Sequence, residues 1–457
     1  MAKIFPFHGI TYSTEKIDDL SSVVTPPYDR IDSQDQEKFY RHSPYNIIRI
    51  IKGKAKPNDD DIDNRYTRAV AYMERWRIEG ILTRAAQPAL YAYYQEYNAQ
   101  GITYLRKGFV ALVELEPSGD GVKGHETTLA GPKADRLKLI RATQANFGHI
   151  FMLYSDPKRQ ANQEIDRAIT GQEPNWQALD NDGNRHMLWE INNKETIAVL
   201  QEAMADKALY IADGHHRYET AVTFMEECRA AGWQTIGAES FQCRMMTMIN
   251  INEPGIVIFP THRVIRNLIA FDRKEFLGNL AGNFVIEELT ALSEILHALA
   301  HREKGEHLFG LYMGGNDFYL LRLRDEQIMD EIIKDRSPEW KRLDVTILHQ
   351  ALLEPLLGID EAALQTQTNV DYVRDSEQAI AMVQAGSHQL ALIMNPTTID
   401  EVRIISDLHE KMPQKSTDFY PKLLTGLVMS QMEIDRTYSV NPSLNRARGR
   451  KEERTTD

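Results

Sequence analysis

The stretch ALYIADGHHRYETA, residues 208–221, joins an apolar run to a tight turn and an amphipathic segment. Residues 208–212 are predicted to form a buried strand, and the Asp-Gly pair at 213–214 turns the chain. A helix is predicted after the turn, because apolar residues recur on one face at helical spacing: Tyr218, Ala221, Val222, Met225 and Cys228. The stretch therefore predicts a strand–turn–helix unit.

The first turn of that helix carries His215, His216 and Arg217. Backbone N–H groups at a helix N-terminus are unpaired and partly positive, so they attract anions, and imidazole and guanidinium groups extend this preference to phosphate. The simpler alternative has Asp213 as the N-cap, Gly214 as the turn residue and partly buried histidines. Two adjacent histidines with an arginine favour the anion site. Metal chelation by the histidine pair is disfavoured, because neighbouring helical residues point in different directions.

A second polar cluster spans residues 124–136, GHETTLAGPKADR, at a predicted strand-to-helix junction. Glu126, next to His125, is a candidate general base or magnesium ligand. Lys133 and Arg136 are candidates for neutralising phosphate. The alternative is a capping pattern with exposed ion pairs, which contribute well under ~1 kcal/mol each. This motif alone does not decide between the two.

Three further segments carry weaker signals. Residues 25–29, TPPYD, must be extended or turned before each proline, which predicts a structural loop with the option of lining a cleft. Residues 260–263, PTHR, offer another cation or a structural histidine. Residues 412–422, MPQKSTDFYPK, place Lys415 and Ser416 among aromatic residues, and a Lys-Ser-Thr loop suggests phosphate. No glycine-rich turn precedes it, so a P-loop is unsupported.

Composition narrows the class of protein. The chain has 457 residues with 53 Lys and Arg against 66 Asp and Glu, so its net charge of −13 disfavours nucleic-acid binding. Two cysteines exclude a disulfide scaffold and an all-cysteine metal site, and such sparse use suits a reducing cytoplasm. No secretory leader and no apolar run near the ~20 residues of a membrane span are present. We expect a cytoplasmic protein with no membrane partner.

The order of predicted elements indicates a mixed α+β fold. After Pro88 the period changes, and strands are predicted at 89–97, 105–116 and 122–129 as an antiparallel meander. A helix is predicted at 133–146 and a strand at 150–154. Strands and helices then interleave without a regular βαβ rhythm. Four segments are expected: an N-terminal α/β segment at 1–88, a core domain at 89–265, a C-terminal α/β lobe at 266–440 and a flexible tail at 441–457.

The motifs together resemble one family, the domain of unknown function 1015 (DUF1015). The matching pieces are TPPYD (25–29), SPYNIIRI (43–50), GHETT with KADR (124–136), NFGHIFMLYSD (146–156), IADGHHRYETA (211–221), FPTHR (259–263), LDVTILH (343–349) and MPQKSTDFYPKLLTG (412–426). The DGHHR turn is also similar to the phosphate loops of ParB-like and sulfiredoxin-like domains, a superfamily that includes free-serine kinases. This resemblance implies a ParB/sulfiredoxin-like core and a mechanism class more than a substrate.

These observations predict a phosphotransferase that acts on a small metabolite, with L-serine or O-phosphoserine and ATP or ADP as the best candidates. His215, His216, Arg217 and Gly214 would hold phosphates, with Lys133, Arg136, Lys415 and Ser416 nearby. Glu126 and His125 would move the hydroxyl proton, and Asp213 would contact Mg²⁺. Two alternatives stay open: a phosphatase that uses water, and a nucleotide-binding regulatory module of ParB type. Self-association into a homodimer is also left open.

Overall fold

The computed structural model describes residues 2–116, 121–128 and 130–436, and these divide into two compact units. Unit 1 comprises the described residues of Met1–Lys123, Thr128–Ile256 and Pro421–Asp457, and unit 2 those of Gly124–Thr127 and Val257–Tyr420. The predicted tail at 441–457 lies outside the described residues. Because this partition follows contacts and not chain order, it differs from the predicted segments, whose boundaries stay predictions.

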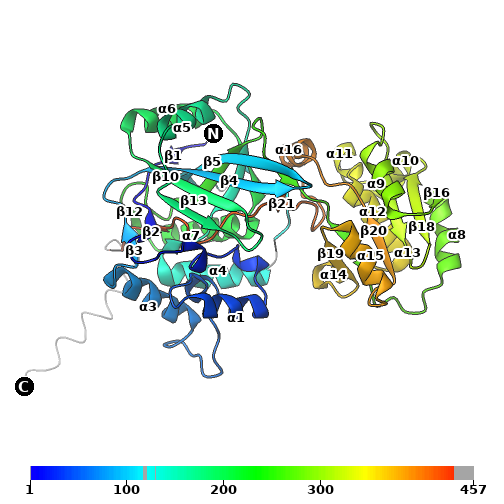
Figure 1. Ribbon diagram of the computed structural model, residues 1–457, viewed down its shortest axis with the longest axis horizontal. Helices are drawn as coiled ribbons and strands as arrows, with labels where there is room; N and C mark the ends of the chain where they lie inside the picture. The colour runs from blue at the N-terminus through cyan, green and yellow to red at the C-terminus, as the bar shows by residue number, and fades with distance from the viewer. Residues whose placement is uncertain (1, 117–120, 129, 437–457) are drawn as a thin grey trace, which may run out of the picture. The chain divides into compact units, whose positions relative to one another are not determined.

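Unit 1 is built on a nine-stranded mixed sheet (Figure 1) with the order β6-β11-β8-β13-β5-β4-β10-β9, and β1 pairs with β5. Its strands are β1 (Ile4–Phe5), β4 (Leu90–Ala99), β5 (Ile102–Glu114), β6 (Val122–Lys123), β8 (Ile150–Tyr154), β9 (Trp176–Leu179), β10 (Arg185–Ile191), β11 (Leu209–Asp213) and β13 (Cys243–Asn250). The β11–β6 and β13–β8 pairs are parallel and the other pairs antiparallel. The predicted mixed α/β class is therefore confirmed.

The predicted meander is only partly correct. Strands β4 and β5 form the expected antiparallel hairpin, whose turn places Gln100 and Gly101 at positive φ. The third predicted strand, 122–129, is wrong: β6 ends at Lys123 and pairs in parallel with β11. The reason lies in the sequence, because the polar residues 124–128 lack the alternation that would bury one face of a longer strand.

Unit 1 also contains seven α-helices among its described residues, and some of them contribute apolar side chains to the core of the sheet. They are α1 (Ser33–His42), α2 (Ile48–Ile51), α3 (Arg65–Ile78), α4 (Ala130–Thr143), α5 (Gln160–Ile169), α6 (Lys194–Met204) and α7 (His215–Ala230), with 3₁₀ turns η1 (Leu20–Ser22) and η2 (Tyr28–Arg30). One core cluster contains residues from the sheet and from α5, α6 and α7. On α7, Tyr218, Ala221, Met225 and Cys228 are buried as predicted, while Val222 is only partly buried. Helix α4 packs against both α3 and α7.

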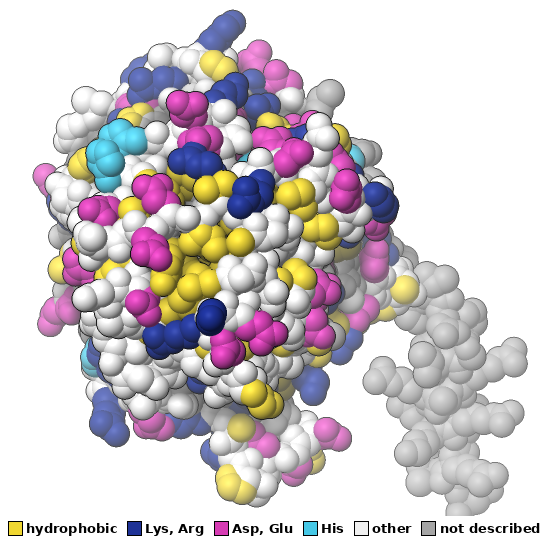
Figure 2. Space-filling model, turned by 90° about the vertical axis from the view of Figure 1, so that its right-hand side faces the viewer, with side chains coloured by type: hydrophobic (Ala, Val, Ile, Leu, Met, Phe, Trp, Pro, Cys, Tyr) yellow, Lys and Arg dark blue, Asp and Glu magenta, His cyan; other side chains and the backbone are white. Residues whose placement is uncertain are grey.

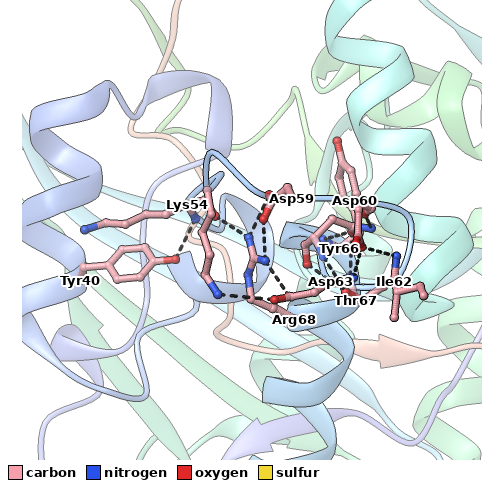
Figure 3. Close-up of polar contacts among 11 residues, drawn as sticks. Tyr40, Lys54, Asp59, Asp60, Ile62, Asp63, Tyr66, Thr67 and Arg68 are labelled. Atoms are coloured by element: carbon pink, nitrogen blue, oxygen red, sulfur yellow. Dashed lines mark hydrogen bonds and ion pairs between the residues drawn. The ribbon is translucent and has the colours of Figure 1, made fainter.

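The loop that leads into α3 is held by its own polar contacts (Figure 3). Arg68 donates to Asp59 at 2.7 Å and to Asp63 at 2.8 Å, and also to the carbonyl of Lys54 at 2.9 Å. Asn64 caps the helix through the amides of residues 66 and 67. These acidic side chains are thus committed to shaping the loop and starting the helix.

Short strand pairs tie distant segments into unit 1. They are β2 (Ile10–Tyr12) with β3 (Leu82–Arg84), β7 (Ala145–Asn146) with β22 (Ser430–Gln431), and β12 (Gln234–Thr235) with β23 (Ile434–Asp435). Two of these pairs use residues beyond 421. The C-terminal part of the described chain therefore returns to unit 1 after unit 2 has been completed.

Unit 2 contains an antiparallel six-stranded sheet with the order β16-β18-β17-β20-β15-β19. Its strands are β15 (His262–Ile265), β16 (Phe284–Leu289), β17 (Leu308–Tyr312), β18 (Phe318–Leu323), β19 (Val370–Val373) and β20 (Leu390–Ile393), with a separate pair β14 (Val257–Ile258) and β21 (Phe419–Tyr420). Its helices are α8 (Arg273–Asn283), α9 (Leu292–Ala300), α10 (Gln327–Ile332), α11 (Pro338–Lys341), α12 (Asp344–Leu348), α13 (Glu354–Leu357), α14 (Glu361–Thr366), α15 (Ser376–Gln384) and α16 (Ile399–Asp407), with a π-helical turn at His349–Leu353. Residues from α9 and α15 complete its core.

Figure 2 shows one face of the molecule, on which acidic and basic side chains are interspersed around a central group of hydrophobic side chains. No broad basic stripe crosses this face. Among the described residues, no helix has both the length and the apolar character that a membrane span requires.

Candidate functional site

The turn between β11 and α7 adopts a conformation that suits glycine. Gly214 has φ +100 and is the N-cap of α7, without a side-chain hydrogen bond. The alternative in which Asp213 caps the helix is therefore wrong. A Cβ built on Gly214 would lie 3.0 Å from Nε of Arg217, so both the backbone angle and the space favour glycine here.

Asp213 links three parts of unit 1. Its Oδ2 accepts a hydrogen bond from Arg217, and its Oδ1 accepts one from Nζ of Lys422 at 2.8 Å. Arg217 is buried and also donates to the backbone carbonyl of His149. Burial alone would raise the pKa of Asp213, but the attraction of Lys422 and Arg217 outweighs it and holds that pKa well below its usual range.

The magnesium role predicted for Asp213 does not fit this arrangement. Both carboxylate oxygens already face a cationic side chain, whereas Mg²⁺ requires oxygens that are open to the metal and several more oxygen ligands. Within the described ranges, no group of three or more His, Cys, Asp or Glu is arranged to hold a metal ion. We therefore assign no metal to Asp213.

A small pocket of about 50 Å³ in unit 1 lies beside this turn and is partly open to solvent. It is lined by Pro27, Tyr28, Ile51, Arg136, Leu139, Ile140, Ala145, Phe147, Gly148, Arg217, Thr220, Arg244 and Thr425. Two residues of the 25–29 loop are among them, which confirms that this loop lines a cleft. The wall combines apolar side chains with three arginines, and the arginines come from three different elements.

Arg136 reaches the pocket from α4 and is held on two sides. Its Nε donates to Oδ2 of Asp135 at 2.9 Å, while Oδ1 of Asp135 accepts from Arg65 at 2.6 Å and from Tyr66 at 2.8 Å. Its guanidinium carbon lies 4.0 Å from the centre of the Tyr28 ring. Burial, with the charge of Asp29, raises the pKa of Tyr28 to about 12, so the phenol stays protonated and can donate a hydrogen bond.

Arg244 enters the pocket from the start of β13 and is buried. Its Nε and Nη1 have no hydrogen-bond partner among the described residues. Burial, together with repulsion from Arg217 and Arg136, lowers the pKa of Arg244 to about 9. The group stays largely protonated near neutral pH, so the pocket holds a positive charge, and two of its nitrogens have no acceptor within the described part of the chain.

The other predicted site residues of unit 1 are Lys133, His215 and His216, and none of them lines the pocket. Nζ of Lys133 lies 3.0 Å from Oε2 of Glu219, which joins α4 to α7, and Lys133 is not part of the pocket wall. His215 is buried and His216 half-buried in the first turn of α7. Both histidines directly follow the glycine turn. Their predicted phosphate role stays a prediction.

The remaining predicted residues fall in unit 2, where two motifs meet. Nε2 of His125 lies 3.2 Å from Oγ1 of Thr417, and Glu126 forms a parallel bridge with Met412. The HET and KST segments are thus neighbours, and they belong to unit 2, whereas Arg217 belongs to unit 1. Their roles in catalysis stay predictions.

The KST loop itself is shaped by local contacts. The hydroxyl of Ser416 donates to the carbonyl of Pro413 at 2.6 Å, and Ser416 is buried. Lys415 has a positive φ and an exposed side chain, and its carbonyl accepts a hydrogen bond from Thr261 at 2.7 Å. The contact with Thr261 connects this loop to the PTHR motif. In that motif, burial lowers the pKa of His262 to about 4, which fits the structural histidine.

Two residues were not identified as site residues from the sequence: Arg244, which lines the pocket, and Lys422, which pairs with Asp213. Arg244 stands in the strand CRMMTMIN, where a charged side chain in an otherwise apolar run was the available signal. The sequence groups Lys422 with the KST loop. The KST loop belongs to unit 2, whereas residues from 421 onward belong to unit 1. Only tertiary contacts show that Lys422 meets Asp213.

Several solved structures are distantly similar to this chain. Among solved structures, a free serine kinase in complex with AMP is 12% identical with a TM-score of 0.34, and the match covers 66% of this chain and 84% of that one. SbnI from Staphylococcus aureus, truncated at its C-terminus, is 11% identical with a TM-score of 0.34, covering 69% and 85%. A conserved hypothetical protein from Pyrococcus furiosus is 14% identical with a TM-score of 0.31, covering 66% and 88%.

Similarity at this level is too low to transfer a function, and no curated protein matches the chain. The family profile is a stronger finding, because it spans most of the sequence. It matches residues 4–346, and the chain therefore belongs to the family described as Protein of unknown function (DUF1015).

Proposed function

We propose that the protein is a phosphotransferase that moves a phosphoryl group between a nucleotide and a small metabolite, with serine or O-phosphoserine as the preferred metabolite. The observation that carries this proposal is the pocket in which Arg217, Arg136 and Arg244 converge beside the glycine turn of α7. Phosphoryl transfer requires mainly positioning and neutralisation of charge, and guanidinium groups supply both.

The proposed roles follow from the contacts. Arg217 is oriented by Asp213 and by the carbonyl of His149, so it meets a ligand without reorganising. Arg136 is oriented in the same way by Asp135. His216 would add a donor at the start of α7. Glu126, the proposed base for the serine hydroxyl, and its neighbour His125 keep this role as part of the proposal.

The direct test measures transfer in both directions with the purified full chain. ADP with O-phospho-L-serine should yield ATP and serine, and ATP with serine should yield ADP and O-phospho-L-serine. Mass spectrometry detects the products of both reactions. Each reaction is run with and without Mg²⁺, since the nucleotide can bring its own metal.

The alternatives give different products. Free phosphate without ATP would identify a phosphatase that uses water. Nucleotide binding with no turnover of either metabolite would identify a regulatory module. Either result would remove the transferase assignment.

A further inference from the structure

The network around the pocket carries more positive than negative charge. Its ion pairs and buried arginines comprise five basic side chains and two carboxylates: Arg65, Arg136, Arg217, Arg244 and Lys422, with Asp135 and Asp213. The adjoining Asp29 and Arg30 add one charge of each sign. Three positive charges are therefore left over in this network. Burying like charges together is unfavourable unless an anion completes the site.

Buried hydrogen-bond donors at the same pocket also indicate that an anion completes the site. Nε and Nη1 of Arg244, Nε of Arg217 and the hydroxyl of Tyr28 are buried and have no partner among the described residues. All three side chains line the pocket. A buried donor without an acceptor is costly, so such groups gathered at one pocket indicate an acceptor-rich ligand.

We propose that Arg136, Arg217, Arg244 and Tyr28 form a binding site for a terminal phosphate dianion. This proposal deepens the proposed function and rests on it for the identity of the phosphate carrier. A terminal phosphate has three oxygens, each able to accept more than one hydrogen bond, and two negative charges. A carboxylate or a phosphodiester has one negative charge and fewer free oxygens, and would leave more of this site unpaired.

The rest of the pocket limits the shape of the ligand. Leu139, Ile140 and Phe147 contribute apolar side chains to the pocket wall. A Cβ built on Gly148 would lie 3.3 Å from Oγ1 of Thr425 and 3.6 Å from Nη1 of Arg217. The glycine therefore leaves open the space next to the arginine. The phosphate belongs either to a small phosphomonoester or to the end of a nucleotide, and the experiment separates the two.

The test is isothermal titration of the full chain with inorganic phosphate, O-phospho-L-serine and ADP. Wild type should bind phosphate, and Arg244→Gln should weaken that binding about ten- to hundredfold, since charge-assisted hydrogen bonds are lost. Arg141→Gln is the matched control, because Arg141 also contacts α7, through Glu227, but its side chain is 49% exposed and outside the pocket. Competition of phosphate with O-phospho-L-serine or with ADP identifies the carrier.

Thermal unfolding separates this role from a structural one. Arg244→Gln removes a buried charge without a carboxylate partner, so the ligand-free melting temperature should stay the same or rise, while stabilisation by phosphate falls. Arg244→Lys keeps the charge but not the planar fork, and should bind with intermediate affinity. A lower melting temperature with unchanged phosphate affinity in both variants would overturn the site.

The two proposals fail separately. Phosphate binding that depends on Arg244, without phosphoryl transfer in any assay, removes the proposed function and leaves the site. Transfer that is unaffected by both Arg244 variants, with no measurable phosphate binding, removes the site and leaves the function.

Discussion

Arg217 shows how much the surroundings of one side chain change its interpretation. From the sequence alone, helical spacing places Arg217 off the apolar stripe of α7, which predicts that Arg217→Ala abolishes phosphoryl transfer and leaves the fold intact. The structure buries it, with 7% of its side chain exposed, against Asp213 and the carbonyl of His149. These contacts instead lead us to expect that alanine at this position destabilises the fold.

Replacing Arg217 with Ala should both destabilise unit 1 and abolish phosphate binding. Loss of the side chain removes the donor to the buried carbonyl of His149 and one of the two cationic side chains that bond Asp213. We expect the free energy of unfolding to fall by about 2–4 kcal/mol. Urea unfolding measures the free energy, and titration with phosphate measures the binding. Arg141→Ala on the same helix pair is the control. Unchanged stability in Arg217→Ala would contradict the structural part of this role.

His149 should make stability depend on pH. Burial lowers its pKa to about 3 from an ordinary 6.5, so the folded protein keeps the ring neutral while the unfolded chain takes up a proton below pH 6.5. The free energy of unfolding should therefore fall as pH drops from 6.5 towards 3, by up to ~1.4 kcal/mol per unit from this group. Comparing His149→Gln with wild type between pH 7 and 4 isolates it. Parallel pH profiles of the two proteins would refute the prediction.

At the scale of elements, the glycine turn between β11 and α7 sets the position of Arg217. Gly214→Ala should cost about 1–2 kcal/mol from its positive φ alone, with a further loss from the approach to Arg217. Gly183→Ala is a matched control, since Gly183 has φ +80 and nothing lies within 4 Å of its Cβ. Both variants should lose stability, but only Gly214→Ala should also lose phosphate affinity. Equal affinity in the two would show that the turn does not position the arginine.

The contact between α4 and α7 should depend little on Lys133. Its ion pair with Glu219 is more than a third exposed on both sides, and such pairs contribute about 0–1 kcal/mol. Lys133→Ala should therefore change the free energy of unfolding by less than ~1 kcal/mol and leave phosphate binding within about twofold. Titration and urea unfolding check both values. A large loss of phosphate affinity would contradict this prediction and support the phosphate role expected from the sequence.

At the scale of the whole molecule, the chain closes unit 1 with residues that come after unit 2. Pro421 accepts a hydrogen bond from the buried Arg106, Lys422 pairs with Asp213, and the amide of Leu424 donates to Tyr93 at 3.1 Å. Strand β22 then pairs with β7. Unit 1 is therefore complete only when the last described segment has returned.

A chain that ends at Tyr420 should fail to fold unit 1, although it retains the residues of all nine strands of the unit 1 sheet. The truncation removes buried apolar residues at 423–432 and leaves the guanidinium of Arg106 with fewer acceptors. Near-UV circular dichroism and limited proteolysis measure the loss. Lys422→Ala in the full chain is the control, because it removes the ion pair alone and should keep the fold. A truncated chain with native spectra and protease resistance would contradict this account.

Local patterns in the amino-acid sequence were enough to predict several elements and the family. Apolar residues at period two and at helical spacing fixed the β4–β5 hairpin and α7, and the Asp-Gly pair fixed the turn between β11 and α7. The family followed from motifs in order along the chain, and its profile confirms it. These features depend on neighbours in sequence, so they can be read without knowing what packs against them.

Which charged side chains share a pocket depends on long-range packing. The polar residues 124–127 and the glycine turn fall in different compact units, while Arg136, Arg217 and Arg244 converge from three elements that are distant in sequence. The burial of Arg217 and the unpaired N–H groups of Arg244 have the same origin. Whether a charged side chain meets water, a carboxylate or another cation depends on the segments that pack around it, and the local pattern of the sequence carries no record of those segments.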